Sequence, residues 1–486
     1  MLVSCLEMQQ LEKAAFARGV EASALMEEAG LGLARIVQET HWAPGRCIAF
    51  CGKGNNAGDA LVALRHLRQW GWEIAVDLAY PVERFSPLPA EHYKALEFSQ
   101  RSRASNVLVA LDGLLGIGAQ GAPRPEIASA IDRINRLRQN EGASVIAIDL
   151  PSGLDGDTGQ PASSCVVADI TATIAFAKRG LVADSATNFV GRLALIPLAD
   201  LSPEKTSGPK IAVSSEIHAW LPPRPFDIHK GVCGRVGIIA GSMGLTGAAR
   251  LSSAAAVAAG AGLVTLYAKE DIQPVLAASC VPEVMVKPVK SYEEVLAEPM
   301  DVLAIGPGMG SSSHTEILSL VQSWPKPMVV DADALNAVAK DPTLLQRCAG
   351  ERLLTPHPGE MERLFPQNGR SRLEWLDAFL TEYPVHLLLK GSRTIIGAPS
   401  GERYYNTTGN PGMASGGMGD VLTGVCAGLV KQCDGDLLRS AVLGAWLCGR
   451  AAEFAASGPY QSPESLSARK VVEALGAAFG ALHRQN

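Results

Sequence analysis

Apolar and polar positions divide the first half of the chain into short strands and longer helices. Residues 8–40 have apolar positions at helical spacing and predict two helices before any strand, with breaks around Gly19 and Gly30. Strands and helices then alternate; the strands are expected at 46–51, 73–79, 107–111 and 144–148, and the helices at 60–70, 89–101 and 126–139. This alternation predicts a doubly wound parallel sheet.

The pattern lapses between Pro197 and Pro225, where polar residues, glycine and a stiff Pro-Pro-Arg-Pro segment predict a domain boundary. We therefore expect one domain over 1–210, a junction over 211–225 and a second domain over 226–486. The second domain has its own apolar runs, at 235–240, 301–305, 327–330 and 385–389. An alanine-rich helix is expected after Gly247, and its small residues permit close packing. The second half is thus also α/β.

Length, composition and charge agree with this division. A chain of 486 residues exceeds what one core usually organises, and 47% hydrophobic with 19% charged residues is typical of globular proteins. The net charge of -6 offers no basic stripe, which argues against nucleic acid or an acidic membrane as a partner. Any phosphate ligand must be held mainly by backbone groups and a few side chains.

Cysteines and the N-terminal residues bear on the compartment. The ten cysteines are scattered, without a C-x-x-C pair or histidines at zinc spacing, and predict reduced, mostly buried thiols. The chain does not start with a basic region followed by an apolar core, as a secretory signal would. The longest weakly polar run, 254–268, reads as a buried helix leading into a strand. We expect a cytoplasmic protein.

The first candidate site follows the first predicted strand. The segment Gly52-Lys-Gly-Asn-Asn-Ala-Gly-Asp59 lies between strand and helix, where a nucleotide fold binds its ligand, but it is not G-x-G-x-x-G. Asn55 and Asn56 offer amide groups to a polar ligand or a hard cation. The same residues would also suit a plain turn.

Two later strands end in a carboxylate and a turn. They are Leu111-Asp112 before Gly-Leu-Leu-Gly116, and Ile148-Asp149 before Leu-Pro-Ser152. Either aspartate alone could be a simple cap. Because parallel strands end at one edge of the sheet, three polar strand ends predict a pocket for a small polar ligand there. The oxygen donors of Asn56, Asp112 and Ser152 also allow a hard or monovalent cation.

A glycine-rich segment near the end of the chain is the second candidate site. Four glycines and a proline occur in Asn410-Pro-Gly-Met-Ala-Ser-Gly-Gly-Met-Gly-Asp420, and an apolar run at helical spacing follows. Unpaired N–H groups at a helix N-terminus bind anions such as phosphate. Asp420 is then well placed as a general base for a hydroxyl that attacks phosphorus. The alternative is a glycine-rich turn in which Asp420 is only a cap.

Two further segments of the second half could reach the same cleft. His357 lies between two prolines, which fix the backbone and aim the imidazole, and Glu360 follows. Lys390 follows a predicted buried strand, precedes a glycine, and could reach a phosphate, with Ser392 and Thr394 as hydroxyl donors. A loop histidine is otherwise usually a surface residue.

These motifs resemble a known family. Gly54-Asn-Asn-Ala-Gly-Asp59, Leu111-Asp-Gly-Leu-Leu-Gly-Ile-Gly118 and Ile148-Asp-Leu-Pro-Ser-Gly153 are similar to the Rossmann-like epimerase domain of bifunctional NAD(P)H-hydrate repair enzymes. The resemblance implies K⁺ ligands at Asn56, Asp112 and Ser152, and Asp149 as a catalytic residue that also contacts substrate. It implies further substrate contacts at Asn55, Asn56, Ala57, Gly58, Asp59, Gly116, Ile117, Gly118, Ala119, Gln120, Gly121 and Ala122. Ala57, Ala60 and Ile117 depart from the family's usual glycine, glycine and threonine.

The second half resembles the ribokinase-like, ADP-dependent NAD(P)H-hydrate dehydratase over essentially its whole length. The matching segments are His229-Lys-Gly, Ala240-Gly-Ser, Gly306-Pro-Gly-Met-Gly, Thr355-Pro-His-Pro-Gly-Glu, Lys390-Gly and the glycine-rich segment that ends at Asp420. The resemblance implies Asp420 as the catalytic base. It implies substrate contacts at Ala248, Gly308, His357 and Asp420, and nucleotide contacts at Lys390, Gly391, Ser392, Arg393, Thr394 and Gly419.

Together the two resemblances imply one repair function. The first domain would interconvert the R and S hydrates of NADH and NADPH at C6. The second would dehydrate the S hydrate at the expense of ADP, giving NAD(P)H, AMP and phosphate. K⁺ would serve the first domain and Mg²⁺ the second, and we expect a homo-oligomer. The alternatives are a kinase for a vitamin-type alcohol fused to a nucleotide-binding domain, and a non-enzymatic nucleotide sensor.

Overall fold

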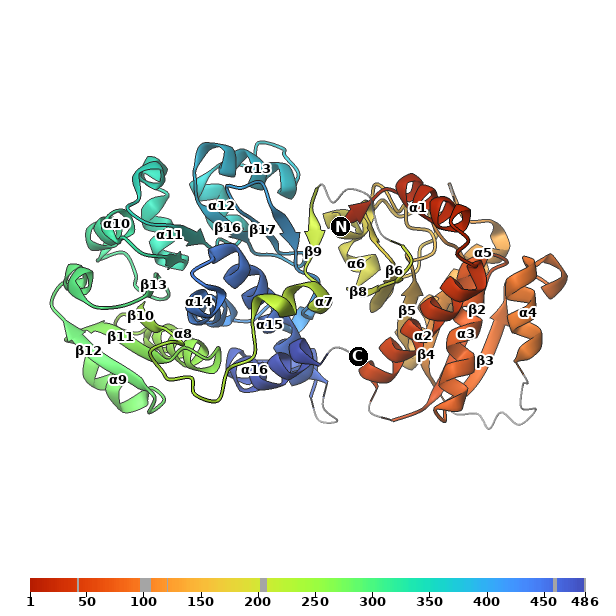
Figure 1. Ribbon diagram of the computed structural model, residues 1–486, viewed down its shortest axis with the longest axis horizontal. Coiled ribbons are helices and arrows are strands. Elements are labelled where there is room, and N and C mark those ends of the chain that lie inside the picture. Colours follow the sequence, from red (N-terminus) through yellow and green to blue (C-terminus); the bar gives the residue numbers. More distant parts are fainter. Residues whose placement is uncertain (42, 97–105, 120, 202–207, 458–460, 485–486) are drawn as a thin grey trace. The chain divides into compact units, whose positions relative to one another are not determined.

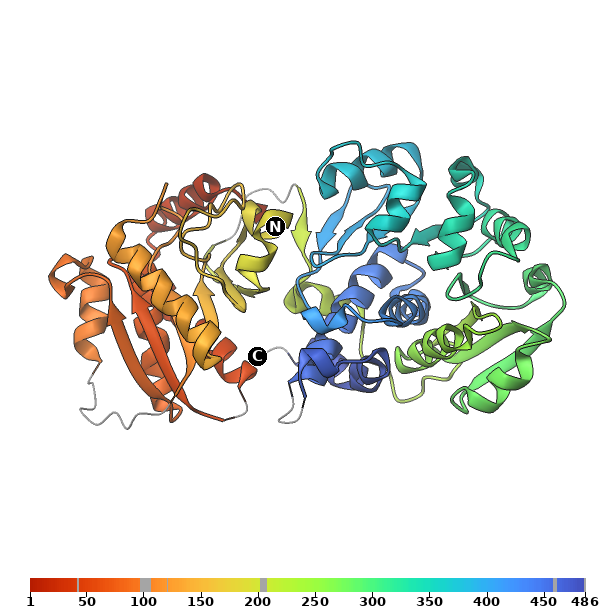
Figure 2. The same ribbon diagram turned by 180° about the vertical axis from the view of Figure 1, so that it is seen from behind.

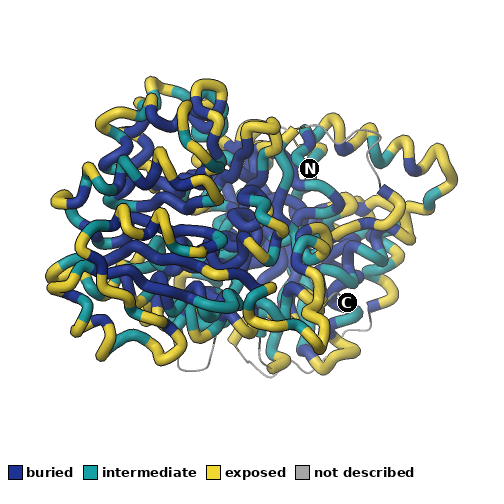
Figure 3. The backbone as a smooth tube through the Cα atoms, turned by 60° about the vertical axis from the view of Figure 1, so that its left-hand side comes forward, coloured by how far each residue is buried: buried dark blue, intermediate teal, exposed yellow. Residues whose placement is uncertain are grey.

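The computed structural model describes residues 1–486 except 42, 97–105, 120, 202–207, 458–460 and 485–486 (Figure 1). The chain forms two compact units, Met1–Gly208 and Pro209–Asn486. In both, the central strands are buried and most exposed residues lie on helices and loops (Figure 3). Across the described residues, no helix combines the length and apolar character that a bilayer crossing needs. All ten cysteines are free of disulfides, and most are buried.

The first unit is built on a six-stranded parallel sheet with the order β3-β2-β4-β5-β6-β8. Its strands are β2 (Arg46–Cys51), β3 (Glu73–Leu78), β4 (Val107–Gly113), β5 (Ser144–Ile148), β6 (Ile170–Ile174) and β8 (Arg192–Ile196); β1 (Leu2–Val3) pairs with β7 (Ala177–Lys178). The helices are α1 (Cys5–Ala17), α2 (Ala22–Thr40), α3 (Asn55–Gln69), α4 (Pro87–Ala95), α5 (Pro125–Arg136) and α6 (Thr187–Val190).

Helices cover both faces of this sheet, because successive strand residues point to opposite sides. On β5, Ile146 packs in the cluster that contains Leu33 of α2 and Leu64 of α3, whereas Val145 packs in the cluster that contains Ile131 of α5. Figure 1 shows α2 and α3 on the near face, and Figure 2, from behind, shows the opposite face with α5. The predicted doubly wound sheet is confirmed.

Two helix predictions in this unit were wrong in detail. The break expected at Gly30 lies inside α2, because Gly30 lets α2 approach α3: a Cβ there would overlap Val62 and lie 3.0 Å from the Asp59 carbonyl. The helix expected from residue 60 begins at Asn55, so the Asn-Asn-Ala-Gly-Asp segment forms its first turns. Gly58 packs against Met26 of α2. Glycine serves here for close helix packing rather than for a turn. Part of the helix expected at 89–101 lies outside the described residues.

The second unit is built on a ten-stranded sheet with the order β12-β11-β10-β13-β14-β15-β16-β17-β18-β9. The strands are β9 (Lys210–Ile211), β10 (Arg235–Ile239), β11 (Leu263–Lys269), β12 (Val284–Val289), β13 (Val302–Ile305), β14 (Met328–Val330), β15 (Arg352–Leu354), β16 (His386–Leu389), β17 (Ile395–Gly397) and β18 (Arg403–Tyr405). In this order, the seven strands from β12 through β16 run parallel to one another. β17 is antiparallel to both β16 and β18.

Helices again flank the sheet. They are α7 (Ser214–Ile217), α8 (Thr246–Ala258), α9 (Gln273–Ser279), α10 (His314–Ser323), α11 (Ala332–Val338), α12 (Pro358–Leu364), α13 (Arg372–Glu382), α14 (Met418–Val430), α15 (Leu437–Ala456) and α16 (Ala468–His483). One large apolar cluster joins α8, α14, α15 and α16 to the strands, through residues such as Ala255, Val425, Leu443 and Val471. The second predicted α/β domain is thus confirmed.

The α8–α14 contact depends on Gly424. A Cβ at this position would overlap the backbone carbonyl of Ser252 and lie 2.9 Å from the Cβ of Ala255. Because interiors are close-packed, α14 could accept a larger residue only by moving away from α8. This fixes the position of a helix whose first turn contains Asp420.

We predict that Gly424→Ala lowers the free energy of unfolding of the second unit by about 1–3 kcal/mol, the usual cost of overpacking. Gly476→Ala is the matched control, since it lies in α16 with nothing within 4 Å of its new Cβ. The control should be neutral or stabilising by up to about 1 kcal/mol. Denaturant unfolding of both variants checks this, and equal stability of the two would contradict it.

Candidate functional site

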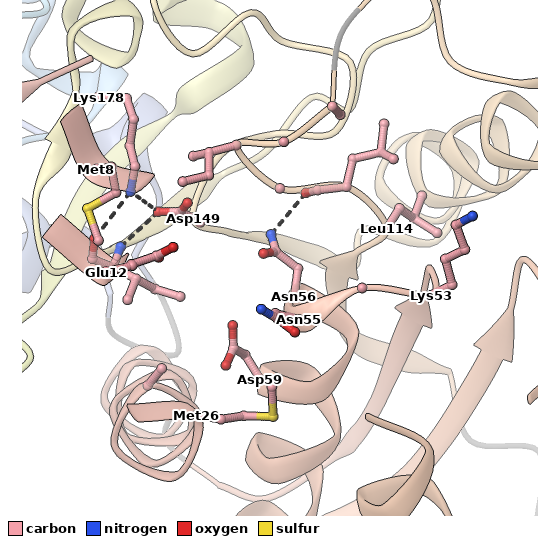
Figure 4. A pocket seen from close by; sticks show the side chains of 18 of the residues that line it. Met8, Glu12, Met26, Lys53, Asn55, Asn56, Asp59, Leu114, Asp149 and Lys178 are labelled. Atoms are coloured by element: carbon pink, nitrogen blue, oxygen red, sulfur yellow. Dashed lines mark hydrogen bonds and ion pairs between the residues drawn. The ribbon is translucent and has the colours of Figure 1, made fainter. Parts of the chain in front are cut away.

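A cavity of about 600 Å³ opens in the first unit at the carboxyl ends of its strands. It lies where the sheet order reverses, since β3 and β4 flank β2 on opposite sides; such a switch point leaves a crevice for a ligand. The N-terminus of α3 and the segment after β4 form two of its walls (Figure 4). The fold therefore creates the predicted pocket.

Most of the first-half residues that we predicted as substrate contacts line this cavity. They are Asn55, Asn56, Asp59, Gly116, Ile117, Gly118, Ala119, Gly121, Ala122 and Asp149. Ala57 and Gly58 do not line it; both are buried, and Gly58 packs against Met26 of α2. Gln120 lies outside the described residues. The helical conformation of residues 55–59 explains the difference, since successive side chains point to different sides of α3.

The three predicted cation ligands belong to one hydrogen-bond network beside the cavity. The Ser152 hydroxyl and N–H donate to the two carboxylate oxygens of Asp112, at 2.7 and 2.8 Å. The Leu115 N–H donates to the Ser152 oxygen at 3.0 Å, and the Leu115 carbonyl accepts from the Asn56 amide at 2.9 Å. Asn56 lines the cavity, whereas Asp112 and Ser152 are fully buried behind it. The structure thus brings the three residues together.

Among the described residues, no basic side chain forms an ion pair with Asp112. Burial raises the pKa of Asp112 to about 6, although the bonds from Ser152 and Leu114 lower it. A cation would favour the ionised form of Asp112. Carboxylate, hydroxyl and amide oxygens are hard donors of the kind that alkali and alkaline-earth ions prefer. The donor set of Asn56, Asp112 and Ser152 therefore fits such an ion.

The third strand end carries an ion pair that sequence reasoning missed. Lys178, which is 0% exposed, forms a short ion pair with Asp149. Asp149 also accepts from the Ile174 N–H at 3.0 Å and from the Thr173 hydroxyl at 3.3 Å, and its φ of 67° is rare for a non-glycine residue. The sequence contains a signal for Lys178, because this lysine follows a short apolar run at 174–177. The same pattern, a lysine directly after an apolar run, singled out Lys390.

Glu12 of α1 is the second residue missed in this cavity. Burial raises its pKa, and the negative charge of Asp149 raises it further, while Lys178 lowers it. The sequence gives no sign of this role, because Glu12 is one of several polar residues on an amphipathic helix that precedes all the motifs.

In the second unit, the predicted base lies near a second ion pair, in which the aspartate is buried and the lysine is partly exposed. Asp420 is the third residue of α14, whose N-cap, Gly417, has a φ of 90°. Lys390, which follows β16, contacts Asp331 at 2.8 Å and Glu360 at 3.7 Å. A Cβ at Gly419 would lie 3.4 Å from the Lys390 Nζ. The helix start and the lysine loop therefore lie side by side.

Asp331 links Lys390 to α14. The sequence analysis did not predict it as a site residue. Its side chain is 2% exposed, and its second oxygen accepts from the Thr423 hydroxyl at 2.9 Å. Burial raises the pKa of Asp420 to about 6, with Asp331 and Asp333 adding to the rise and Lys390 opposing it. A carboxylate with a pKa slightly below neutral suits a general base at physiological pH.

The remaining residues predicted in this half differ in position and exposure. His357 is the N-cap of α12: its Nδ1 accepts from Gly359, and Glu360 accepts from the His357 N–H. Gly308, with a φ of 62°, lies against Ala248, since a Cβ on Gly308 would be 2.9 Å from the Ala248 Cβ. Arg393 is 4% exposed, so its side chain faces the interior. The hydroxyl of Thr394 donates to the Gly391 carbonyl at 3.0 Å, and Ser392 is exposed.

Arg372 of α13 contacts the lysine loop, residues 390–394, and was also missed by the sequence analysis. Its guanidinium donates to the carbonyls of Leu389, Lys390 and Arg393 at 2.9–3.1 Å. A Cβ at Gly391 would lie 2.6 Å from the same guanidinium, so only glycine allows this approach. Three bonds from one rigid fork fix the loop conformation.

Comparisons with known proteins match both units. The chain matches the family model for the YjeF-related protein N-terminus over residues 22–180, and the family model for NAD(P)H-hydrate dehydratase over residues 236–473. It is 38% identical to the bifunctional NAD(P)H-hydrate repair enzyme of Moorella thermoacetica, covering 94% of this chain and 92% of that protein. The corresponding enzyme of Escherichia coli is 35% identical, covering 86% and 83%.

Solved structures resemble the part of the chain that carries Asp420. The ADP/ATP-dependent NAD(P)H-hydrate dehydratase from Bacillus subtilis, co-crystallised with ATP and Mg²⁺, is 28% identical with a TM-score of 0.50, covering 56% of this chain and 99% of that one. A ribokinase-like superfamily protein from Enterococcus faecalis is 26% identical with a TM-score of 0.50, covering 58% and 99%. The predicted ribokinase-like fold is confirmed.

We predict that Arg372→Met speeds amide hydrogen exchange in residues 391–394 roughly 30-fold, because losing three bonds to carbonyls lowers the free energy of local opening by about 2 kcal/mol. Arg403→Met is the matched control, since Arg403 contacts Asp377 and the Ala398 and Glu402 carbonyls on another loop. Mass spectrometry of exchanged peptides measures both. Unchanged exchange in Arg372→Met would show that the loop does not depend on this clamp.

Proposed function

The chain belongs to the family of bifunctional NAD(P)H-hydrate repair enzymes, and from this premise we propose which of its residues carry out each of the two reactions. It is an NAD(P)H-hydrate epimerase and dehydratase. The kinase and sensor alternatives lose their support, because the similarity to bifunctional repair enzymes extends over 94% of the chain.

We assign the epimerase activity to the first unit and the dehydratase activity to the second. Their predicted borders, 1–210 and 226–486 with a junction between, are close to the division after Gly208. The assignment is supported by two family models that match separate parts of the chain. Each unit also has its own group of polar residues at the carboxyl ends of its strands.

In the dehydratase, Asp420 removes the proton of the C6 hydroxyl of the S hydrate. The oxygen attacks the terminal phosphorus of ADP and AMP leaves; the phosphorylated intermediate then loses phosphate from C6 and a proton from C5 to give NAD(P)H. Unpaired N–H groups at the start of α14, together with Lys390, stabilise charge on the transferring phosphoryl group. The observation that supports this most is the approach of Gly419 to Lys390 beside Asp420.

The nucleotide would lie along residues 390–394 and Gly419, with His357, Ala248 and Gly308 on the substrate side. ADP as the donor is our choice; the similar Bacillus subtilis protein is ADP/ATP-dependent and was crystallised with ATP and Mg²⁺. When bound, Mg²⁺ neutralises phosphate charge, and the carboxylates that flank Lys390, Asp331 and Glu360, are suitable oxygen donors for it.

In the epimerase, the hydrated nicotinamide nucleotide would fill the first-unit cavity, against Asn55, Asp59, Asp149 and the segment 116–122. K⁺ would be held by Asn56, Asp112 and Ser152, and it would fix the segment after β4 through the network that includes Leu115. The substrates are thus the hydrates of NADH and NADPH together with ADP. The homo-oligomer and the cytoplasmic location stay predictions.

We predict that Asp420→Asn lowers the dehydratase kcat by about 10²–10⁴, the usual contribution of a general base, and leaves epimerisation unchanged. In the unsubstituted enzyme, kcat should rise with pH through about 6, because Asp420 must lose its proton to act. Absorbance of the regenerated reduced ring follows the reaction on pure S hydrate. Asp301→Asn, at the far end of β13, is the control. Equal loss of both activities in folded Asp420→Asn would refute the assignment.

We predict that Asp112→Asn abolishes the effect of K⁺ on epimerisation and on stability, because it removes the charged ligand of the ion. K⁺ stabilises the unit because it binds the folded state only. With K⁺ at 100 times its Kd, that stabilisation is about 2.7 kcal/mol. Epimer exchange and thermal unfolding are measured in K⁺ and in tetramethylammonium at equal ionic strength. Asp169→Asn, which removes a carboxylate of the same unit paired with Arg138, should keep the K⁺ effect. A K⁺ effect that persists in Asp112→Asn would place the ion elsewhere.

A further inference from the structure

Asp59 is a buried carboxyl group with an unexplained environment. It lies on α3, is 6% exposed and lines the first-unit cavity. Among the described residues, its side chain makes no hydrogen bond or ion pair, although a buried carboxylate usually has both. Figure 4 shows its carboxyl group directed from α3 toward the region of Asn55 and Asp149. A group held this way points to a ligand in the cavity.

Asp149, in the same cavity, has the opposite environment. Its carboxylate is paired with the fully buried Lys178 and accepts bonds from Ile174 and Thr173. Lys178 also donates to the Ile174 carbonyl at 3.2 Å, which fixes the ammonium group in place. These contacts give Asp149 a counter-ion and fixed hydrogen-bond donors. The cavity therefore contains one carboxylate with a counter-ion and one carboxyl group without.

The other charged groups of the cavity reinforce this difference. Burial raises the pKa of Asp59 well above its usual value, and the negative charges of Asp149 and of Glu12 on α1 raise it further. Lys178 is paired with Asp149. Lys53 and Arg124 also line the cavity, and neither is paired with Asp59. Burial and these two negative charges therefore favour the protonated form of Asp59. Two carboxyl groups whose environments separate them in this way can act as acid and base.

The substrate needs such a couple. At C6 of the hydrated ring, one carbon bears a hydroxyl group and is also bonded to the ring nitrogen N1. Inversion at this carbon requires that one of its bonds break and form again on the other face. Opening the C6–N1 bond requires a base for the hydroxyl proton and an acid for N1.

We propose that Asp59 is the proton donor to N1 and Asp149 the base for the C6 hydroxyl, with Lys178 as the positioning residue for Asp149. The proposal rests on our assignment of epimerisation to this cavity. Asp149 takes the hydroxyl proton, C6 becomes an aldehyde carbon, and the electron pair of the C6–N1 bond moves to N1, which takes the proton of Asp59. Rotation about C5–C6 presents the other face of the aldehyde.

The return step reverses each transfer. N1 attacks C6 and gives its proton back to Asp59, while the aldehyde oxygen takes the proton from Asp149. Both carboxyl groups regain their starting states, and no oxidant, reductant or added water is consumed. The C6 oxygen stays on its carbon throughout, which distinguishes this route from loss and re-addition of water.

The first experiment tests the residues on the full chain. Asp59→Asn should lower the epimerase kcat about 10²-fold or more and change KM less than about threefold. The amide has nearly the shape of the carboxyl group but cannot transfer a proton as an acid. Lys178→Met should lower kcat at least about tenfold, and Lys178→Arg should recover part of the loss. Dehydration of pure S hydrate by the other unit, with thermal unfolding of the first unit, controls for folding.

A cavity variant separates this proposal from the site assignment. Ile117→Trp fills the cavity from its wall. If it abolishes epimerisation while folded Asp59→Asn keeps full kcat, the acid role of Asp59 is refuted and the site stands. If folded Ile117→Trp epimerises normally, the site assignment itself fails, and the proposal fails with it. Asp169→Asn, a carboxylate that does not line the cavity, should stay within about twofold of the unsubstituted kcat.

Epimerisation in ¹⁸O-labelled water tests the chemical route. Ring opening predicts that the product keeps its original C6 oxygen, so each turnover introduces no label. Incorporation of ¹⁸O at the rate of epimerisation would show that water leaves and returns, and would overturn the ring-opening step. Mass spectrometry of the recovered hydrates measures the label.

Discussion

An ion pair between a lysine and a buried aspartate at a strand end is the interaction on which both sites depend. In the first unit Lys178 pairs with Asp149, and in the second Lys390 pairs with Asp331. Leaving one member of such a pair without its partner costs about 3–5 kcal/mol, because an uncompensated charge stays in the interior. Each pair is therefore a fixed reference point, and the polar groups that carry out chemistry are arranged around it.

The environment of each neighbouring carboxyl group then decides its role. Burial raises the pKa of Asp420 to about 6, with Asp331 adding to the rise and Lys390 opposing it, so Asp420 is mostly ionised near neutral pH and able to accept a proton. Burial, with the negative charges of Asp149 and Glu12, raises the pKa of Asp59 well above its usual value and favours its protonated form. In the roles proposed above, the same type of side chain acts as a base in one unit and as an acid in the other, because burial and nearby charges differ between the two sites.

The sequence predicted what depends on local pattern. Strand ends, glycine segments and the acidic residues that follow them placed Asn56, Asp112, Asp149, Lys390 and Asp420 at the correct edge of each sheet, because parallel strands end together. Contacts made across the fold had no such signal: Glu12 reaches the cavity from a helix before the first motif, and Arg372 reaches the lysine loop from α13. Gly30 and Gly58 looked like turn residues, but their role is helix packing, which depends on a partner helix that the sequence does not specify.

The position of Asp420 is finally a matter of core packing rather than of its own loop. Thr423, one turn further along α14, donates to Asp331, and Gly424 then packs against α8. These two contacts fix the rotation and the depth of the helix. A shift of one residue along α14 would rotate the Asp420 side chain by about 100° and direct it away from Lys390. The catalytic geometry of the second unit is therefore set by the same contacts that stabilise its fold, and a variant that loosens the α8–α14 interface should lose alignment before it loses secondary structure.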